Sequence, residues 1–310
     1  MASEFELIRR LTQGLEPGPS VLLGPGDDAA VLRPDGDIAV TCDLLVENVH
    51  FKRQWSSGFD VGRKAVAVNV SDVEAMGAAP SAIVVGLGVP RDLGQDWIED
   101  FGRGVREEAG RAGVSLVGGD LSSAAHITVC VTAHGNLQGR RPVTRSGAQP
   151  DDQVAVAGHL GWSGAGLAVL QRGFSSPAEL VAEHRCPQVP YGQGRRIAEV
   201  GATAMCDVSD GLIADLGHIS NASGVGIDVA SASLVGTDAI ARVAAATNTD
   251  PLQYLLAGGE DHALVATLRP DIPLPQGWTS IGTVIRGSGI TVDGQPFAGR
   301  PGWDHFRSIR

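Results

Sequence analysis

The sequence predicts a mixed α/β protein that folds as two domains. The chain has 310 residues, roughly twice the common domain size of about 150. Hydrophobic residues make up 43% of the chain and charged residues 19%, which supplies apolar material for two cores and excludes a disordered chain. Strand-like and helix-like segments alternate in both halves, and a polar connection rich in Arg, Gly and Pro joins the halves at 135–152. We place the domain boundary in this connection, between domains 1–137 and 138–310.

Helices are expected where apolar residues recur at helical spacing, as Phe5, Ile8 and Leu11 do, and strands where short apolar runs are bounded by turn residues. The expected helices, in chain order, are 4–15, 61–76, 92–112, 165–171, 211–220 and 239–246. The expected strands are 29–32, 38–42, 81–89, 114–117, 127–133, 153–157, 202–208, 227–229, 262–268 and 279–285. The turn 33–37, with its Pro, Asp and Gly, separates the first two strands, and Gly77 ends the second helix.

Two observations predict a cytoplasmic protein. No apolar run approaches the ~20 residues that cross a bilayer, and the N-terminal segment MASEFELIRRL, an amphipathic helix start with acidic residues, lacks the basic start of an export signal. The four cysteines form no CxxC pair and have no histidine at zinc-site spacing. We therefore expect reduced, buried thiols at Cys42, Cys130, Cys186 and Cys206.

The charge balance indicates which groups of this protein would bind phosphate. The formal net charge is −11, and no basic run is present, which argues against a nucleic-acid-binding protein. Only two lysines occur, Lys52 and Lys64, so a lysine-rich phosphate cradle is excluded. Phosphate binding would depend instead on Mg²⁺ held by carboxylates, since Mg²⁺ prefers hard oxygen ligands.

The acidic residues favour such a site because of their positions. Six short acidic segments lie beside Gly or Ser, and each is expected at the end of an apolar element. They are 26–28, 41–43, 71–72, 118–120, 207–211 and 258–261. Carboxylates at strand ends can converge, and several of them together would repel one another unless divalent cations neutralise them. The pattern therefore predicts a site with several metal ions and oxygen ligands.

Each acidic segment also has a purely structural interpretation. An Asp beside Gly is usually a turn former or a helix cap, and Asp210 could simply cap the helix that follows it. Asp72 is different because it lies inside an apolar helix. There it shares a face with Asn69, and a half-buried carboxylate at that position needs a partner.

Other motifs point less clearly to chemistry. The sequence has no GxxxxGK[ST] phosphate loop and no Gly-x-Ser-x-Gly elbow, and 158–166 fits a tight strand-to-helix turn as well as a dinucleotide site. His50 is either structural or a ligand contact. Arg145 is either a phosphate clamp or part of a polar loop. Trp303 either packs or stacks on a flat ligand.

With these residues in place, the chain resembles the thiamine-monophosphate kinase family, within the aminoimidazole ribonucleotide synthetase-like superfamily. The resemblance rests on an ordered series of motifs from EFELI to GWDHF that covers nearly the whole chain. The motifs are GDDAAVL, TCDLLVENVHF, KAVAVNVSDVEAMGAAP, GGD, TRSGAQPDD, DVSDGLIADLGHI and GGEDHAL. As an ordered series these motifs are specific, whereas SDGL-type segments also occur in the superfamily's other members.

The resemblance implies a two-domain α/β (α+β) fold and a reaction. The N-terminal α/β domain, 1–137, would bind ATP and Mg²⁺, and its strands would form a barrel across a homodimer. The C-terminal α+β domain, 138–310, would close the active site. The implied reaction is ATP- and Mg²⁺-dependent phosphorylation of thiamine monophosphate to thiamine diphosphate by direct in-line transfer, the last step of thiamine diphosphate biosynthesis. The acceptor is already a phosphate, largely dianionic at neutral pH, so the reaction needs no general base.

The resemblance also implies site residues. The metal ligands would be Asp28, Thr41, Cys42 through its backbone carbonyl, Asp43, Asp72, Asp120, Asp207 and Asp210. The nucleotide would contact Gly119, Asp120, Arg145 and Ser209, and the thiamine phosphate would contact His50, Glu260 and Trp303. Asp72, Asp210 and Arg145 would be catalytic. The chain departs from the family pattern at Cys42, where Thr is common, and at His262 and Ala263, where Tyr and Glu are usual.

Two other hypotheses stay open at this point. The first is a different ATP-dependent synthetase of the same superfamily, of the purine-precursor or selenophosphate type. The segment 24–30 has neither the reactive Cys nor the Lys of selenophosphate makers, which argues against that version. The second is a non-catalytic protein that binds a metal or a nucleotide, in which the acidic segments are caps and solvated loops.

Overall fold

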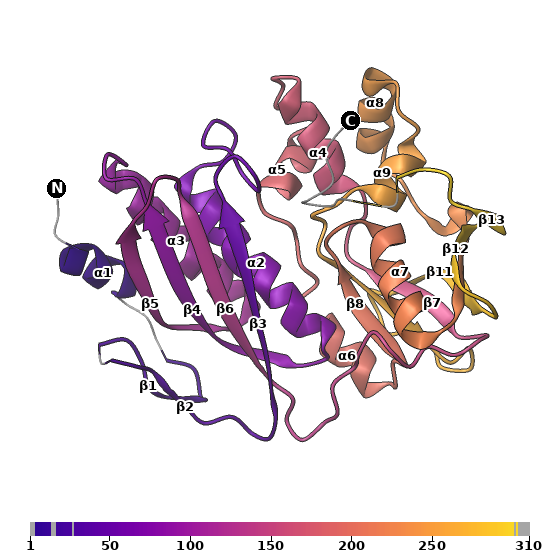
Figure 1. Cartoon of the computed structure of the whole chain (residues 1–310), viewed down its shortest axis with the longest axis horizontal. Coiled ribbons are helices and arrows are strands. Elements are labelled where there is room, and N and C mark those ends of the chain that lie inside the picture. The colour runs from indigo at the N-terminus through magenta and orange to yellow at the C-terminus, as the bar shows by residue number, and fades with distance from the viewer. Residues whose placement is uncertain (1–3, 14–16, 27, 301, 303–310) are drawn as a thin grey trace. The chain divides into compact units, whose positions relative to one another are not determined.

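The computed structural model describes residues 4–13, 17–26, 28–300 and 302. The chain divides into two compact units (Figure 1). The first unit contains residues up to Glu74 and Ala78–Pro142, and the second contains Ala75–Gly77 and the chain from Val143 onward. The change from one unit to the other at 142/143 falls inside the polar connection, five residues beyond the boundary placed from the sequence. Within the described residues, we find no helix with the length and apolar character that a membrane crossing requires.

The first unit contains a four-stranded sheet in the order β3-β6-β4-β5. Its helices are α1 (Glu4–Thr12), α2 (Gly58–Ala75, whose last residue belongs to the second unit) and α3 (Gln95–Ala112). Its strands are β1 (Val21–Leu23), β2 (Val31–Leu32), β3 (Ile38–Val46), β4 (Ala79–Val89), β5 (Ser115–Ser123) and β6 (Thr128–Asn136). The strands β4 and β5 run parallel, the other neighbours in the sheet are antiparallel, and β1 and β2 form a separate antiparallel pair.

The helices α2 and α3 lie on one side of this sheet (Figure 1). They pack without side chains between them at two glycines: a Cβ at Gly104 would lie 2.1 Å from the Phe59 carbonyl oxygen, and one at Gly62 would lie 2.2 Å from that of Phe101. An ion pair between the half-buried Arg63 and the buried Glu108 also joins the two helices. This close contact positions α2 against the sheet.

The second unit contains a seven-stranded sheet in the order β13-β12-β9-β11-β7-β10-β8. Its strands are β7 (Gln153–Ala157), β8 (Ala204–Val208), β9 (Gly226–Val229), β10 (Ala263–Leu268), β11 (Thr279–Ile285), β12 (Gly289–Val292) and β13 (Gln295–Pro296). Its helices are α4 (Trp162–Gln171), α5 (Ala178–Arg185), α6 (Gln193–Glu199), α7 (Leu212–Ser223), α8 (Asp238–Thr247), α9 (Pro251–Ala257) and the 3-10 turn Ser231–Ser233.

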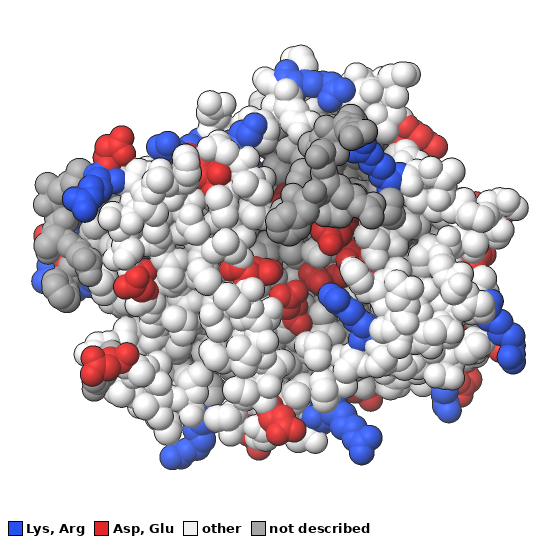
Figure 2. Space-filling model, viewed as in Figure 1, with Lys and Arg blue, Asp and Glu red and all other residues white. Residues whose placement is uncertain are grey.

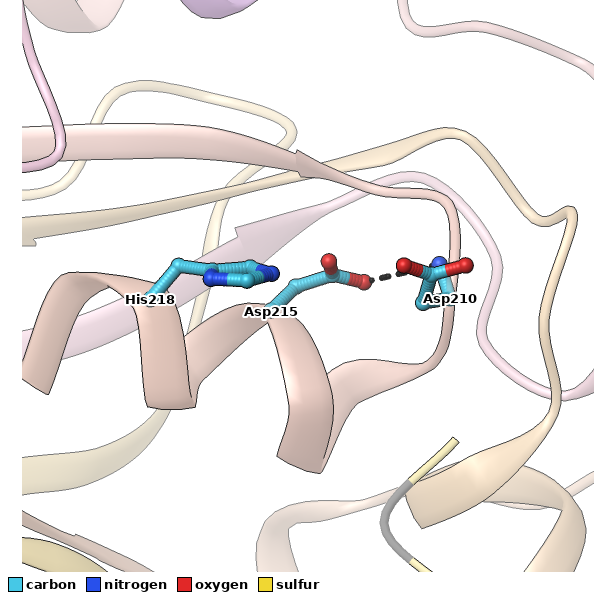
Figure 3. A group of neighbouring side chains, drawn as sticks. All are labelled: Asp210, Asp215 and His218. Carbon is cyan, nitrogen blue, oxygen red and sulfur yellow. Dashed lines mark hydrogen bonds between the residues drawn. The ribbon is translucent and has the colours of Figure 1, made fainter. Parts of the chain in front are cut away.

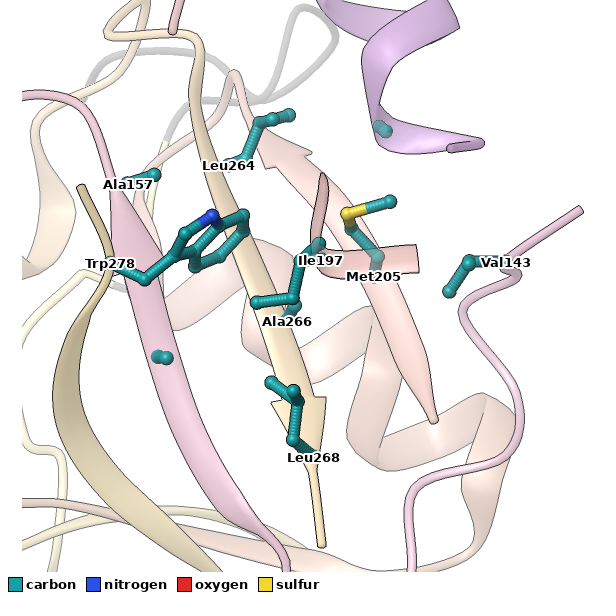
Figure 4. Packing of buried hydrophobic residues seen from close by; sticks show 10 residues of the cluster. Val143, Ala157, Ile197, Met205, Leu264, Ala266, Leu268 and Trp278 are labelled. Atoms are coloured by element: carbon teal, nitrogen blue, oxygen red, sulfur yellow. The ribbon is translucent and has the colours of Figure 1, made fainter. Parts of the chain in front are cut away.

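Successive residues of a strand point to opposite faces of this sheet, and each face has its own cover. On one face Met205, Leu264 and Ala266 pack with Ile197 of α6 and with Trp278 (Figure 4). On the other, Cys206 points toward α7, where its thiol lies 3.6 Å from the Asp215 carbonyl oxygen. The central strands are therefore buried on both sides.

Candidate functional site

The first group of predicted ligands comes together between β3 and α2. The Thr41 hydroxyl donates to Asp72 Oδ2 at 2.6 Å, and the Asp43 backbone N–H donates to Asn69 Oδ1 at 2.8 Å. These bonds fix the half-buried carboxylate of Asp72 beside the strand that carries Thr41 and Asp43. The expectation that Asp72 shares a face with Asn69 and needs a partner is confirmed, and its partner includes Thr41.

Cys42 lies between these two ligands but on the opposite face of β3. Its side chain is exposed, and its Sγ lies 3.3 Å from Sγ of Cys130 on β6. The expectation of four buried thiols is therefore wrong for Cys42 and Cys130, although both are free and Cys186 and Cys206 are buried. The thiol points away from Thr41 and Asp43, so only the backbone of Cys42 can serve the same ligand group.

Asp120 is not brought to this group within the first unit. Asp120 is exposed and pairs with Gly86 of β4. Gly86 pairs in turn with Cys130 of β6, and Cys130 pairs with Leu44 of β3. Because paired residues point to the same face of a sheet, the side chain of Asp120 shares a face with Leu44 and not with Asp43. It also lies on β5, at the opposite edge of the sheet from β3. Asp43 and Asp120 thus occupy opposite edges and opposite faces.

The expectation that every acidic segment ends an element is also corrected at 41–43 and 118–120, which lie inside strands, and at 71–72, which lies inside α2. The two glycines before Asp120 suggested a turn. In the structure Gly119 lies inside β5. The position requires Gly because a Cβ there would lie 2.2 Å from the Val85 carbonyl oxygen.

Gly119 and Asp120 line an apolar pocket that the sequence did not reveal. Most of its lining comes from α1, α3, β4 and β5 and is hydrophobic, with Leu11, Phe101 and Leu116 among the contributors. An apolar lining with a few polar groups at the wall is the usual composition of a small-molecule site.

The remaining predicted residues of the first unit are Asp28 and His50. Asp28 is exposed, in the loop before β2. His50 is half-buried: its Nδ1 accepts the Val46 N–H at 3.0 Å, and its carbonyl oxygen accepts from the buried Nζ of Lys64 at 3.1 Å. One hydrogen bond therefore holds the imidazole of His50, and another holds its backbone.

The second group of predicted ligands lies in the turn from β8 to α7. Asp207 is buried near the end of β8, and Asp210 precedes Gly211, the residue that caps α7. The purely capping interpretation of Asp210 is therefore wrong. Asp215 Oδ2 accepts the N–H of Asp210 at 3.1 Å (Figure 3) and that of Gly211 at 3.0 Å.

Asp215 and His218 extend this group, and the sequence analysis missed both of them. The two residues lie about one turn apart on α7, the helix that follows Asp210. One ligand atom from each of Asp210, Asp215 and His218 lies within 4.8 Å of the others, close enough to hold an ion (Figure 3). Burial, together with the neighbouring carboxylates of Asp207 and Asp210, raises the pKa of Asp215 to about 7. Closely spaced carboxylates of this kind are stabilised by a divalent cation.

The loop before β10 packs along the same turn. The Glu260 N–H donates to the Ser209 carbonyl oxygen at 2.6 Å, and the His262 N–H donates to that of Val208 at 2.8 Å. The Glu260 carboxylate lies 3.5 Å from His184 Nδ1. Asp261 is fully buried and accepts N–H groups of the loop that begins α4, and burial raises its pKa to about 7.

Two predicted residues contribute less to the described site. Arg145 is exposed, and its carbonyl oxygen accepts from the Ser223 hydroxyl at 3.1 Å. Trp303 lies outside the described residues. On the face drawn in Figure 2, Lys and Arg are scattered and interspersed with Asp and Glu, in line with the absence of a basic run from the sequence.

Comparison with known proteins gives a family model and close relatives. Residues 26–137 match the model described as AIR synthase related protein, N-terminal domain. Over 306 residues the chain is 49% identical to the thiamine-monophosphate kinase of Mycobacterium tuberculosis, and the match covers 98% of this chain and 91% of that protein.

Solved structures agree over the same length. The crystal structure of thiamine-monophosphate kinase from Stenotrophomonas maltophilia K279a matches with a TM-score of 0.81 at 32% identity, over 94% of this chain and 96% of that one. The structure described as AaThiL complexed with AMPPCP and TMP matches with a TM-score of 0.78 at 33% identity, over 97% and 96%. The similarity therefore extends through both units.

Proposed function

The chain belongs to the thiamine-monophosphate kinase family, and from that premise we propose that it transfers the γ-phosphoryl group of ATP directly to thiamine monophosphate. The products are ADP and thiamine diphosphate. The structural observation that best supports this function is the all-oxygen group of Thr41, Asp43 and Asp72, held by hydrogen bonds between β3 and α2. Such donors suit Mg²⁺, which in turn binds nucleotide phosphates.

The donor sets of both units fit Mg²⁺, because they offer hard oxygen atoms and no thiolate. In the first unit the proposed ligands are Asp28, Thr41, the Cys42 carbonyl, Asp43, Asp72 and Asp120. In the second unit they are Asp207 and Asp210. The structure supports a role for Asp207 and Asp210 through the third carboxylate, Asp215, which crowds negative charge at their turn. Bound Mg²⁺ would neutralise the negative charges of the phosphate groups.

The proposed nucleotide contacts are Gly119, Asp120, Arg145 and Ser209. The apolar pocket lined by Leu11, Phe101 and Leu116 supports placing the adenine beside Gly119 and Asp120. In support of nucleotide use by this fold, the matched AaThiL structure is complexed with AMPPCP and TMP.

The proposed acceptor contacts are His50, Glu260 and Trp303. His50 can present its imidazole because its backbone is fixed by Lys64. Glu260 has a carboxylate 31% exposed, on a backbone held by Ser209, and it can meet a cationic heterocycle such as thiazolium. Trp303 would supply an aromatic surface for stacking.

In this reaction the residues of the protein position the reacting phosphate groups. The acceptor phosphate is already an anion, so no residue has to remove a proton from it. Asp72 and Asp210 would each align phosphate groups through the cations that they hold, and the Arg145 guanidinium would bind the transferred group as a planar fork. Transfer in line follows from that alignment.

We also propose that the protein is a homodimer whose first units join at β3, as in a barrel made from two sheets. The outer face of β3 carries Ile38, Val40 and Leu44, which are 47%, 55% and 48% exposed. An edge strand with this much exposed apolar surface favours a partner strand. The separation of Asp120 from Asp43 within one unit supports a second copy as the source of the missing ligand. The cytoplasmic location stays a prediction.

The reaction is tested by incubating the purified chain with ATP, Mg²⁺ and thiamine monophosphate and identifying the products by mass. We expect thiamine diphosphate and ADP in equal amounts, and neither product when the metal is chelated. ADP without thiamine diphosphate would exclude the proposed acceptor. Turnover with an aminoimidazole precursor or selenide instead would support the synthetase hypothesis.

A further inference from the structure

The side chain of His262 contacts a proposed metal ligand. Its Nδ1 lies 3.0 Å from Asp207 Oδ2, and both side chains are buried, with 7% and 5% of their surfaces exposed. An ionised carboxylate can only accept a hydrogen bond, so Nδ1 is the donor of this bond when Asp207 is ionised as a metal ligand. The family pattern has Tyr at this position, and this chain has His.

We propose that His262 is a positioning residue for Asp207. It holds Oδ2 and thereby turns Oδ1 toward a divalent cation. This inference rests on the metal assignment within the proposed function. Hydrogen bonds to ligating carboxylates fix the direction in which the free oxygen points, and their loss typically weakens metal binding by about 10- to 100-fold.

The backbone conformation around His262 supports a fixed position for its imidazole. His262 and Glu260 both have left-handed conformations, with φ of 50° and 63°. Such conformations cost free energy in residues other than Gly, and here two backbone bonds to Val208 and Ser209 hold them. The same turn is fixed from its other side by the bonds from Asp210 and Gly211 to Asp215. The imidazole therefore reaches Asp207 from a rigid position.

A simpler interpretation is that the pair only satisfies a buried carboxylate and contributes to stability. The two interpretations differ in what they predict for metal affinity. If His262 orients Asp207 toward a cation, removing its donor weakens metal binding in a protein that remains folded. A purely structural pair changes the melting temperature and leaves metal affinity unchanged.

The test measures Mn²⁺ binding by electron paramagnetic resonance without nucleotide or acceptor, together with the melting temperature of each variant. We expect His262→Phe to weaken Mn²⁺ binding about tenfold or more. His262→Asn places an amide donor where Nδ1 stands and tolerates a left-handed backbone, so it should retain most of the affinity. His262→Gln places its donor near Nε2 and should behave as Phe does, which keeps the test informative if the Phe variant does not fold.

Two controls isolate the contact. His134→Phe removes a half-buried histidine of the first unit that is outside the proposed site, and it should leave Mn²⁺ affinity unchanged. In an Asp207→Asn background, His262→Phe should cause no further loss, because the two residues act as one unit. The proposal is overturned if folded His262→Phe and His262→Gln bind Mn²⁺ as the parent does, if the losses add, or if the parent binds no Mn²⁺. A parent that binds Mn²⁺ but forms no thiamine diphosphate overturns the proposed reaction and not this inference.

Discussion

The Thr41 hydroxyl on β3 donates a 2.6 Å hydrogen bond to Oδ2 of Asp72 on α2. This bond joins two residues 31 positions apart in the sequence and orients a half-buried carboxylate on the face of α2 that also carries Asn69. A half-buried charge costs free energy unless hydrogen bonds or an opposite charge compensate for the lost water. The proposed cation would complete what the Thr41 hydroxyl begins.

Asp72→Asn should therefore lower kcat at least about a hundredfold, because metal ligation contributes several kcal/mol to the transition state. The amide oxygen can still accept from Thr41, so the melting temperature should change little. Turnover is measured with ATP, Mg²⁺ and thiamine monophosphate. The control is Asp100→Asn, at an exposed ion pair on α3, which should behave as the parent does. Parent-like turnover in Asp72→Asn would remove this residue from the metal site.

The apolar pocket beside Gly119 gives a test of nucleotide binding. Leu116→Trp should fill the pocket and raise the KM for ATP about tenfold or more, since it removes the space for a heterocycle. The KM for thiamine monophosphate should change far less. Both constants are obtained from initial rates, and equal KM values for ATP in parent and variant would place the adenine elsewhere.

The contact between α2 and α3 gives a test of packing. Gly104→Ala would bring a methyl group to 2.1 Å from the Phe59 carbonyl oxygen, so the helices must separate. We expect a loss of about 1–3 kcal/mol in the free energy of unfolding, or more, measured with urea. Gly110→Ala on the same helix meets nothing within 4 Å and should stabilise by about 0.5–1 kcal/mol. Similar effects of the two substitutions would contradict the close contact.

Asp261 gives a test of pH dependence. Burial raises its pKa to about 7 from an ordinary 3.8, so between these values the folded state keeps a proton that the unfolded chain has released. Its contribution to stability is therefore present at low pH and is lost as the pH rises through about 7.

The parent should accordingly lose more unfolding free energy than Asp261→Asn between about pH 5 and about pH 8. The Asn variant should be less stable overall by about 1–3 kcal/mol, because each Asp261 oxygen accepts a separate N–H and an amide can accept only one. Urea unfolding at both pH values gives the comparison. Asp271→Asn, at an exposed ion pair, should follow the parent. Parallel pH profiles for parent and Asp261→Asn would show that this carboxyl does not titrate differently in the fold.

The proposed dimer is tested at β3. Val40→Asp puts a charge on its exposed apolar face and should convert a dimer into a monomer, as measured by light scattering. Val235→Asp, at a more exposed valine of the second unit, should leave the mass unchanged. A parent that is monomeric at the concentrations of the activity assay would contradict the dimer.

Much of the fold could be predicted because hydrophobic periodicity specifies long elements. The strands at Gln153–Ala157 and Thr279–Ile285 were predicted with their observed bounds. The short helices α5, α6 and α9 were missed, since seven or eight residues show little periodicity. In α9 the capping Asp250 and the following Pro251 carried a start signal.

The site was predictable only as far as residue types allow. The pairing of Asp72 with Asn69 follows from helical spacing, but the partner Thr41 depends on how β3 lies against α2. The contact of His262 with Asp207 depends on two left-handed residues, and nothing in the sequence around Gly259 specifies those conformations. The placement of Asp120 was misjudged because glycines normally signal turns, whereas here Gly119 allows close strand packing.

The strand β3 has a consequence for the chain while it is being synthesised. Its sequence, IAVTCDLLV, has strong β propensity and a single charge, Asp43. Until this segment pairs with β6 it has the character of an aggregation-prone stretch, and Asp43 is the gatekeeper that opposes self-association. In the proposed metal site, Asp43 would therefore serve both as a ligand and as the charge that keeps this strand soluble. Neutral substitutions of Asp43 should accordingly reduce the yield of soluble protein as well as catalysis.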